Sequence, residues 1–343
     1  MLEEIRQQPA ALARMLSGEL RRVEKFKRLV QKRRPRLIVL VARGTSDNAA
    51  LFGRYLLEIT TGIPVSLCAP SISTLYQTRL DYRDALVVAI SQSGESTDTN
   101  QVLERARLQG ALTLGITNES GSALASIAEH IFLVRAGRER SVAATKTYTG
   151  QMLIMYLLAY ALGARLRIAD LERIPDVVNA TLALEPEIDA LSERYRFMHH
   201  AVVVGRGLNY ANAFEFALKL METCYVVAER FSSADLMHGP IALVEPNFPC
   251  FVFAPPDRTW PSIGASLTKL HGLRAEIVAI TDSGNSEAKT HATKVIRMPR
   301  RVKEVLTPIP YIVPAQIFAA CLAAQKDLDA DSPRTLSKVT LTL

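Results

Sequence analysis

Short apolar runs alternate with longer amphipathic stretches along most of the chain. Runs rich in Val, Ile and Leu and bounded by turn residues predict buried parallel strands, and the stretches between them have helical spacing. The first series of predicted strands covers residues 37–41, 64–67, 85–90, 111–116 and 131–134. This order predicts an α/β fold with a five-stranded, doubly wound, flavodoxin-like parallel sheet flanked by helices.

A second series of five strands follows the first. It covers residues 201–204, 225–228, 249–254, 275–280 and 294–298. The two series overlay at a nearly constant offset, because Arg43-Gly44 matches Arg206-Gly207 and Ile116-Thr117-Asn118 matches Ile280-Thr281-Asp282. A repeat of this length indicates a duplicated domain rather than a solenoid. Ligands of open α/β sheets bind at the carboxyl ends of strands, so we expect chemistry there.

The pattern divides the chain into five segments. We expect a helical N-terminal segment (1–35), a first α/β domain (36–165), a charged helical linker (166–195), a second α/β domain (196–330) and a C-terminal tail (331–343).

The basic surplus of the chain is local. The formal net charge is +7, and residues 1–36 account for it. Such a cluster is compatible with nucleic-acid binding. Apolar residues nevertheless recur between the basic ones at helical spacing, namely Leu16, Leu20, Val23, Phe26 and Val30. The pattern favours an amphipathic helix with a solvated basic face, and we expect no nucleic-acid partner.

Composition narrows the class of protein further. The 343 residues are 48% hydrophobic and 22% charged, enough for two cores and unlike a disordered or fibrous chain. The longest nearly apolar run, 152–163, is shorter than the about 20 residues that span a bilayer, and acids near Met1 argue against a secretory signal. We expect a cytoplasmic protein without a membrane partner.

The four cysteines do not form a recognisable site. Cys68, Cys224, Cys250 and Cys321 lie far apart, with no CxxC pair and no His at metal-ligand spacing. They are predicted to be reduced core residues, and no metal site is expected.

Two hydroxyl-rich turns follow predicted strands. Strand 37–41 leads into Arg43-Gly44-Thr45-Ser46, and strand 85–90 leads into Ser91-Gln92-Ser93-Gly94-Glu95-Ser96-Thr97. Hydroxyls and free N–H groups at a helix N-terminus suit a phosphate, although ordinary helix caps use the same residues. Neither turn has the lysine of an ATP-binding loop. Gly205-Arg206-Gly207 begins like a dinucleotide fingerprint, but Tyr210 fills its third glycine position, so we expect no nucleotide cofactor.

Three charged residues lie along one side of a predicted apolar helix. Glu215, Lys219 and Glu222 have helical spacing, which fits either a surface salt-bridge ladder or a buried charged cluster with a purpose. His238 lies in the turn Met237-His238-Gly239-Pro240, where it is either structural or an acid–base group. Composition alone assigns no role to the tail that contains Lys338.

Several segments spread over nearly the whole chain match one known pattern. They are Glu4-Ile5 to Gln8-Pro9, Arg43-Gly44-Thr45-Ser46, Ser91 to Thr99, Val142-Ala143-Ala144-Thr145-Lys146, Gly205-Arg206-Gly207, Glu215 to Glu222, His238-Gly239-Pro240 and Pro333-Arg334 with Lys338. Together they resemble the sugar isomerase (SIS) domain family, as found in the isomerase half of glucosamine-6-phosphate synthase and in stand-alone deaminases of that type. The resemblance implies two tandem SIS domains.

The resemblance also implies roles for individual residues. The phosphate of a hexose 6-phosphate would be held by Thr45, Ser46, Ser91, Gln92, Ser93 and Thr97, and the sugar by Gly44, Ala143, Ala144 and Thr145. Glu222 would move a proton between C1 and C2, and His238 would assist ring opening within a homodimer with shared active sites. Lys338 would reach the sugar carbonyl, and Glu215 and Lys219 would form a supporting relay. Neither a cofactor nor a metal is implied.

Aldose–ketose interconversion explains these residue types. It needs one base within reach of both carbons, and a partly desolvated carboxylate such as that of Glu222 has a pKa suited to this. A neutral-range imidazole can open the ring, and an amine such as Lys338 can form an imine if it is partly unprotonated.

Departures from the synthase shape the expected reaction. The synthase begins with a glutaminase domain, whereas this sequence enters the sugar domain almost at once, so we expect deamination of glucosamine 6-phosphate to fructose 6-phosphate and ammonia. Ala144 replaces a Ser, Met221 replaces a Lys, and Ser337-Lys338-Val339-Thr340 is one residue shorter than its counterpart. A fructosamine-6-phosphate deglycase, another phosphosugar isomerase and a non-catalytic sugar phosphate sensor stay open as alternatives. The sensor is disfavoured by the simultaneous presence of Glu222, His238 and Lys338.

Overall fold

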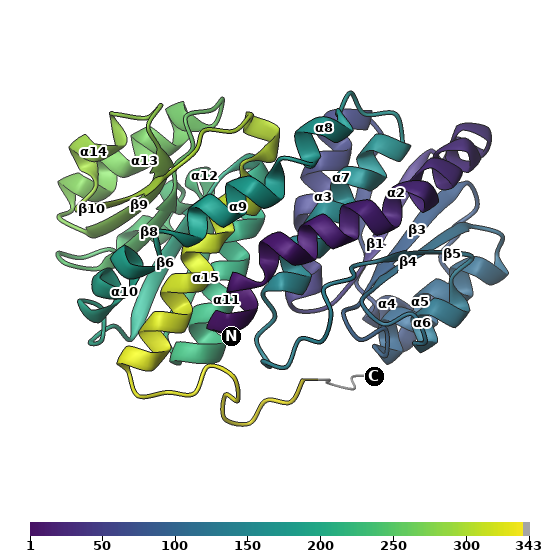
Figure 1. The fold of residues 1–343 in the computed structure, drawn as a ribbon, viewed down its shortest axis with the longest axis horizontal. Coiled ribbons are helices and arrows are strands. Elements are labelled where there is room, and N and C mark those ends of the chain that lie inside the picture. The colour runs from purple at the N-terminus through teal and green to yellow at the C-terminus, as the bar shows by residue number, and fades with distance from the viewer. Residues whose placement is uncertain (339–343) are drawn as a thin grey trace. The chain divides into compact units, whose positions relative to one another are not determined.

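The computed structural model describes residues 1–338 and consists of two compact units (Figure 1). The N-terminal unit comprises Gln7–Glu139, Ala144–Pro175 and, among the described residues of the tail, Ser337 and Lys338. The C-terminal unit comprises Met1–Arg6, Arg140–Ala143 and Asp176–Leu336. Val339 and Thr340 of the predicted tail lie outside the described residues. Each unit contains one parallel sheet and is described by itself.

The sheet of the N-terminal unit has the strand order β2-β1-β3-β4-β5, with all neighbours parallel. Its strands are β1 (Leu37–Val41), β2 (Val65–Leu67), β3 (Ala85–Ile90), β4 (Leu112–Thr117) and β5 (His130–Leu133). Every residue of the central strand β3 is buried, as an apolar run between two helical layers requires. The chain leaves β1 and β3 in opposite directions along the sheet, so the order reverses between these two strands.

Helices cover both faces of this sheet (Figure 1). They are α2 (Gln8–Arg33), α3 (Thr45–Thr61), α4 (Ser71–Thr74), α5 (Thr97–Leu108), α6 (Ala123–Ile127), α7 (Lys146–Ala161) and α8 (Ile168–Leu171), followed by α9 (Ile174–Leu182) at the change of unit. Helix α7 is buried almost all round and packs against α2 and α3. The amphipathic interpretation of α2 is confirmed, because Val23, Phe26 and Val30 are buried while most of its basic residues are exposed.

The C-terminal unit repeats the same sheet, which confirms the predicted duplication. Its order is β10-β9-β8-β6-β7, built from β6 (His200–Gly205), β7 (Val227–Ser232), β8 (Pro249–Phe253), β9 (Glu276–Asp282) and β10 (Lys294–Met298). Its helices are α1 (Leu2–Arg6), α10 (Glu185–Glu193), α11 (Tyr210–Cys224), α12 (Ser233–Met237), α13 (Trp260–Gly272), α14 (Ala288–His291) and α15 (Pro308–Gln325), with short 3₁₀ turns at Gly207–Asn209, Pro240–Leu243 and Glu304–Leu306.

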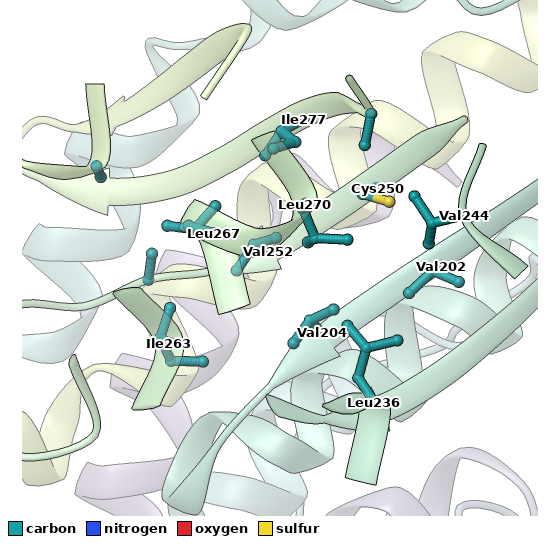
Figure 2. Close-up of a cluster of buried hydrophobic side chains, with 13 residues drawn as sticks. Val202, Val204, Leu236, Val244, Cys250, Val252, Ile263, Leu267, Leu270 and Ile277 are labelled. Carbon is teal, nitrogen blue, oxygen red and sulfur yellow. The ribbon is translucent and has the colours of Figure 1, made fainter. Parts of the chain in front are cut away.

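Two apolar layers enclose this second sheet. Figure 2 shows one of them, in which Val202 and Val204 of β6 and Val252 of β8 face Leu267 and Leu270 of α13. The opposite layer is aromatic and joins α11 and α15 to β8, through contacts among Phe216, Phe251, Phe318 and Tyr195. Because both faces of the sheet are buried, the sequence of each central strand is a continuous apolar run.

Two elements differ from the sequence pattern. The strand expected at 225–228 begins two residues later, because Tyr225 ends α11 in the left-handed conformation with φ 53° and cannot be part of a strand. Helix α15 was not singled out, because Pro308, Pro310 and Pro314 interrupt its pattern and proline inside a helix is unfavourable. In residues 1–338 it is the one helix that is long and apolar enough to cross a membrane, yet 89% of it is buried inside the protein, as in a core helix.

The cysteines provide a test of the two cores. Cys224 and Cys250 are buried and unpaired, and burial raises the pKa of their thiols to about 11 and about 12, whereas Cys68 is only half-buried. Because the thiolate is the reactive form, iodoacetamide at pH 8 should modify Cys68 first and leave Cys224 and Cys250 intact in the native protein. Peptide mass spectrometry after timed quenching measures how fast each cysteine is modified. Denatured protein, in which all four should react, is the control, and rapid native modification of Cys250 would contradict the described packing.

Candidate functional site

The turn after β1 places a serine hydroxyl at the start of α3. Gly44 precedes the helix with φ 55°, a conformation that favours glycine, and Thr45 and Ser46 form its first turn. Ser46 is largely buried, and the side-chain amide of Gln151 on α7 donates to its Oγ at 2.9 Å. Because Oγ accepts that bond, the hydroxyl proton of Ser46 can be donated to a ligand.

The turn after β3 is shaped by its own hydroxyls. Ser91 Oγ accepts from the Gly94 N–H at 3.0 Å, and Ser93 Oγ accepts from the Glu95 N–H at 3.2 Å. Gly94 has φ 72°, and a Cβ there would overlap the Ser122 hydroxyl, so only glycine fits. Asn100 of α5 donates to the Gly94 carbonyl at 3.0 Å and thereby fixes the turn to the helix that Thr97 begins.

Both turns lie at the same edge of the sheet. Val41 at the end of β1 is paired with Ala89 of β3, so the two following turns start side by side. Ser46 and Ser91 are buried, while the other predicted phosphate residues, Thr45, Gln92, Ser93 and Thr97, are half-exposed. The structure therefore collects the hydroxyls of two helix N-termini, α3 and α5, at the point where the strand order reverses, where open α/β sheets bind ligands.

An ion pair ties the two turns together. The guanidinium of Arg43 contacts Asp98 Oδ2 through Nε at 2.7 Å and Nη2 at 2.6 Å. The Asp98 side chain is fully buried and also accepts from the Thr99 N–H at 2.7 Å, whereas that of Arg43 is 49% exposed. Sequence reasoning gave neither residue a role, because 55 positions separate them. The only available signal was that each lies within one of the hydroxyl-rich turns.

A buried carboxylate organises the start of α7. Thr145, a predicted sugar-binding residue, donates its N–H to Glu139 Oε1 at 3.0 Å, and Lys338 donates to Glu139 Oε2 at 2.9 Å. Of the other predicted sugar-binding residues, Ala143 is buried in the C-terminal unit and Ala144 is half-buried in the N-terminal unit. Sequence reasoning missed Glu139. The signal in the sequence was an acid shortly before Ala144-Thr145-Lys146, which is part of a segment that carries the family resemblance.

The charged cluster of α11 lies inside the C-terminal unit. Lys219 Nζ lies 3.4 Å from Glu215 Oε1 and 2.6 Å from Glu222 Oε2. Glu215 and Lys219 are buried and the Glu222 side chain is 24% exposed, so the alternative of a surface ladder is wrong. Burial disfavours the charged Lys219, but the two neighbouring carboxylates outweigh this effect and raise the pKa of its ammonium. Glu222 is therefore the accessible end of a buried charged row.

His238 lies at the end of α12 in the same unit. Its side chain is exposed, and Gly239, with φ 139°, turns the chain into the 3₁₀ turn that starts at Pro240. An exposed imidazole is available for proton exchange. Within residues 1–338, no group of three or more His, Cys, Asp or Glu is placed to hold a metal ion.

The Arg43–Asp98 pair predicts unequal effects of its two substitutions. Arg43→Met leaves a buried carboxylate without its cation and should lower the free energy of unfolding by about 3 kcal/mol. Asp98→Asn keeps an oxygen for the Thr99 N–H and frees a half-exposed guanidinium, so about 1 kcal/mol is expected. Urea unfolding measures both. Arg54→Met, which removes an exposed contact to Glu58 at 3.7 Å, is the control and should cost less than about 0.5 kcal/mol. A larger loss for Asp98→Asn than for Arg43→Met would contradict the described burial.

Known proteins with similar sequences and structures cover nearly the whole chain. The glutamine–fructose-6-phosphate aminotransferase (isomerizing) of Aquifex aeolicus is 33% identical over 98% of this chain, which spans 57% of that enzyme's length. The solved C-terminal domain of glucosamine-fructose-6-phosphate aminotransferase from Francisella tularensis is 29% identical with a TM-score of 0.87, covering 97% of this chain and 98% of that domain. A Silicibacter pomeroyi structure, provisionally described as a phosphosugar isomerase, is 31% identical with a TM-score of 0.85, covering 96% of this chain and 99% of its own.

The family profile of the SIS domain matches the chain twice, over residues 31–161 and 196–326. Each match contains one of the two five-stranded sheets, together with one of the two charged or hydroxyl-rich constellations described above. The relatives with matching sequences are aminotransferases of which this chain resembles the isomerase half. The chain belongs to the SIS domain family, as a tandem pair of SIS domains.

Proposed function

We propose that this protein is a phosphosugar isomerase that deaminates an amino sugar 6-phosphate, with glucosamine 6-phosphate as the leading substrate. The observation that carries the proposal is the pair of helix N-termini after β1 and β3, which Arg43 and Asp98 hold side by side. Hydroxyl groups gathered at two helix N-termini suit an anionic ester such as a sugar 6-phosphate. In this proposal Thr45, Ser46, Ser91, Gln92, Ser93 and Thr97 bind that phosphate.

Glu222 is the proton-transferring base of the proposed reaction. In the open-chain sugar it takes the proton from C2 and returns it to C1, while a proton passes from the nitrogen to the oxygen on C1. The imine left at C2 reacts with water to give the ketone of fructose 6-phosphate and ammonia. The 24% exposure of the Glu222 side chain leaves its carboxylate accessible, and the Lys219 contact at 2.6 Å fixes its position.

Two further residues complete the proposal. His238 protonates the ring oxygen to open the pyranose, within a homodimer that shares its active sites, because its imidazole is exposed and an imidazole can both donate and accept a proton. Lys338 offers its amino group to the sugar carbonyl. Glu215 and Lys219 position Glu222 from inside the unit.

The proposed direction is ammonia release. Deamination of glucosamine 6-phosphate needs water as its only co-reactant, whereas the reverse reaction needs a nitrogen donor.

A substrate panel tests this proposal against its alternatives. Glucosamine 6-phosphate, galactosamine 6-phosphate and fructosamine 6-phosphate are incubated with the full chain, and ammonia and the product sugar phosphates are measured. Fructose 6-phosphate and ammonia in equal amounts from glucosamine 6-phosphate is the expected result. Turnover of fructosamine 6-phosphate alone would indicate a deglycase, and saturable binding without turnover would indicate a sensor.

The role of Glu222 gives a sharp prediction. Glu222→Gln keeps the size of the side chain but removes the base, so kcat for ammonia release should fall by at least about 100-fold while KM stays within about threefold. Steady-state assays with coupled ammonia detection measure both constants. Glu229→Gln, an exposed change in the same unit, is the matched control and should keep full activity. Undiminished turnover of Glu222→Gln would remove Glu222 from the mechanism.

The phosphate assignment gives a second prediction. Ser93→Ala removes one hydrogen bond to a charged group, worth about 1.5 to 3 kcal/mol, so KM should rise by about 10-fold or more with a smaller change in kcat. Inhibition by inorganic phosphate should weaken in parallel. Ser120→Ala, an exposed serine after β4, is the control. An unchanged KM in Ser93→Ala would contradict the assignment.

A further inference from the structure

We propose that Glu139 is a positioning residue that docks the end of the chain by binding Lys338. Docking itself depends only on the contacts of Glu139. Its consequence for turnover rests on the function proposed above, in which the amino group of Lys338 must reach a sugar carbonyl.

The two oxygens of Glu139 perform separate tasks. Oε1 accepts the backbone N–H groups of Thr145 at 3.0 Å and Thr147 at 3.1 Å, which caps the N-terminus of α7. Oε2 accepts the Thr147 hydroxyl at 2.7 Å and the Lys338 ammonium at 2.9 Å. A residue needed only as a helix cap would use the first oxygen. The second oxygen receives a cation 199 positions further along the chain.

The environment of Glu139 explains why it needs a cation. Its side chain has no exposed surface, and burial alone would raise the pKa of its carboxyl. The charge of Lys338 and the hydrogen bonds from Thr145 and Thr147 outweigh this effect and lower the pKa below its usual value. The carboxylate is therefore charged at neutral pH, and losing Lys338 would leave that buried charge with neutral donors only.

The loop that carries Glu139 is held by contacts that do not involve Lys338. The buried Lys146 donates to the carbonyl of Arg138 at 2.6 Å and to Gln7 Oε1 at 2.8 Å, so the residue before Glu139 is held independently of the tail. The tail has an earlier attachment of its own. Arg334 donates its N–H to the Tyr225 hydroxyl at 2.8 Å and places its guanidinium over that ring, within the C-terminal unit. Lys338 is a later attachment of the tail, within the N-terminal unit, and its contact with Glu139 holds its amino group.

Glu139→Gln separates docking from capping. The glutamine carbonyl oxygen can still accept from Thr145 and Thr147, and its NH₂ can donate to the Thr147 hydroxyl, but it cannot accept from Lys338. Thr147→Val is the matched control, because it removes a contact to the same oxygen and leaves the ion pair in place.

Trypsin cleavage after Lys338 and Arg334 of the full chain, followed by intact mass spectrometry, tests docking without any substrate. Cleavage of Glu139→Gln at least about 10-fold faster than wild type, with Thr147→Val close to wild type, is the expected result. Equal rates in wild type and Glu139→Gln would overturn the proposal. Lys338→Met tests the same contact without touching the helix cap, should Glu139→Gln fail to fold. Cleavage after Arg334 should then accelerate, and an unchanged rate would overturn docking.

A double-mutant cycle tests positioning during turnover. Glu139→Gln should lower kcat for ammonia release by about 10-fold or more with KM nearly unchanged, and it should add nothing to the loss caused by Lys338→Met. Multiplying losses in the double variant, or full activity of Glu139→Gln beside an inactive Lys338→Met, would overturn the positioning role. A wild-type protein that turns over no sugar phosphate would overturn the proposed function instead, and the trypsin result would still decide docking.

Discussion

Parallel pairing of β1 with β3 is the constraint on which the candidate site depends. Because these strands are parallel, the chain leaves both at the same edge of the sheet and starts α3 and α5 there, at the point where the strand order reverses. The positive ends of the helix dipoles would repel one another without a compensating group. The hydroxyls of the two turns and the Arg43–Asp98 pair fix the geometry, and an anion bound there would complete it.

Fully buried carboxylates pair with a basic side chain at three places in the N-terminal unit. Asp98 pairs with Arg43, Glu139 with Lys338, and Glu19 of α2 with Arg135 at 2.6 Å. In each case the acid is fully buried and the basic side chain reaches toward the surface. Such pairs stabilise a fold less than apolar packing of the same volume, so their use here favours a role in geometry. The Lys219 cluster inverts this arrangement, since the cation is buried and the carboxylate of Glu222 is the accessible member.

The sequence was sufficient to predict the sheets and the turns, and physical reasons explain what it left out. A strand that is buried on both faces has a continuous apolar sequence. The predicted ends of nine of the ten strands therefore lie within two residues of the observed ends, and the tenth, β7, starts later because Tyr225 ends α11. The hydroxyl-rich turns were found because each is contiguous. Asp98 and Glu139 were not assigned roles, because their partners are distant in sequence and a lone acid outside an apolar run usually faces solvent. Helix α15 was not predicted, because it contains several prolines and is stabilised by tertiary packing, which cannot be inferred from a local sequence pattern.

The turn after the third strand differs between the two copies of the domain, β3 in the N-terminal unit and β8 in the C-terminal unit. After β8 the chain continues as Ala254-Pro255-Pro256 instead of a hydroxyl-rich turn. The Asp257 carboxylate then accepts the N–H and hydroxyl of Thr259, at 2.7 and 2.6 Å, beside the N-terminus of α13. Pro255 and Pro256 provide no N–H donors in this turn. In the function proposed above, the phosphate is bound by turns of the N-terminal copy, and the proton is transferred by Glu222 of α11, the helix that follows the first strand of the C-terminal copy.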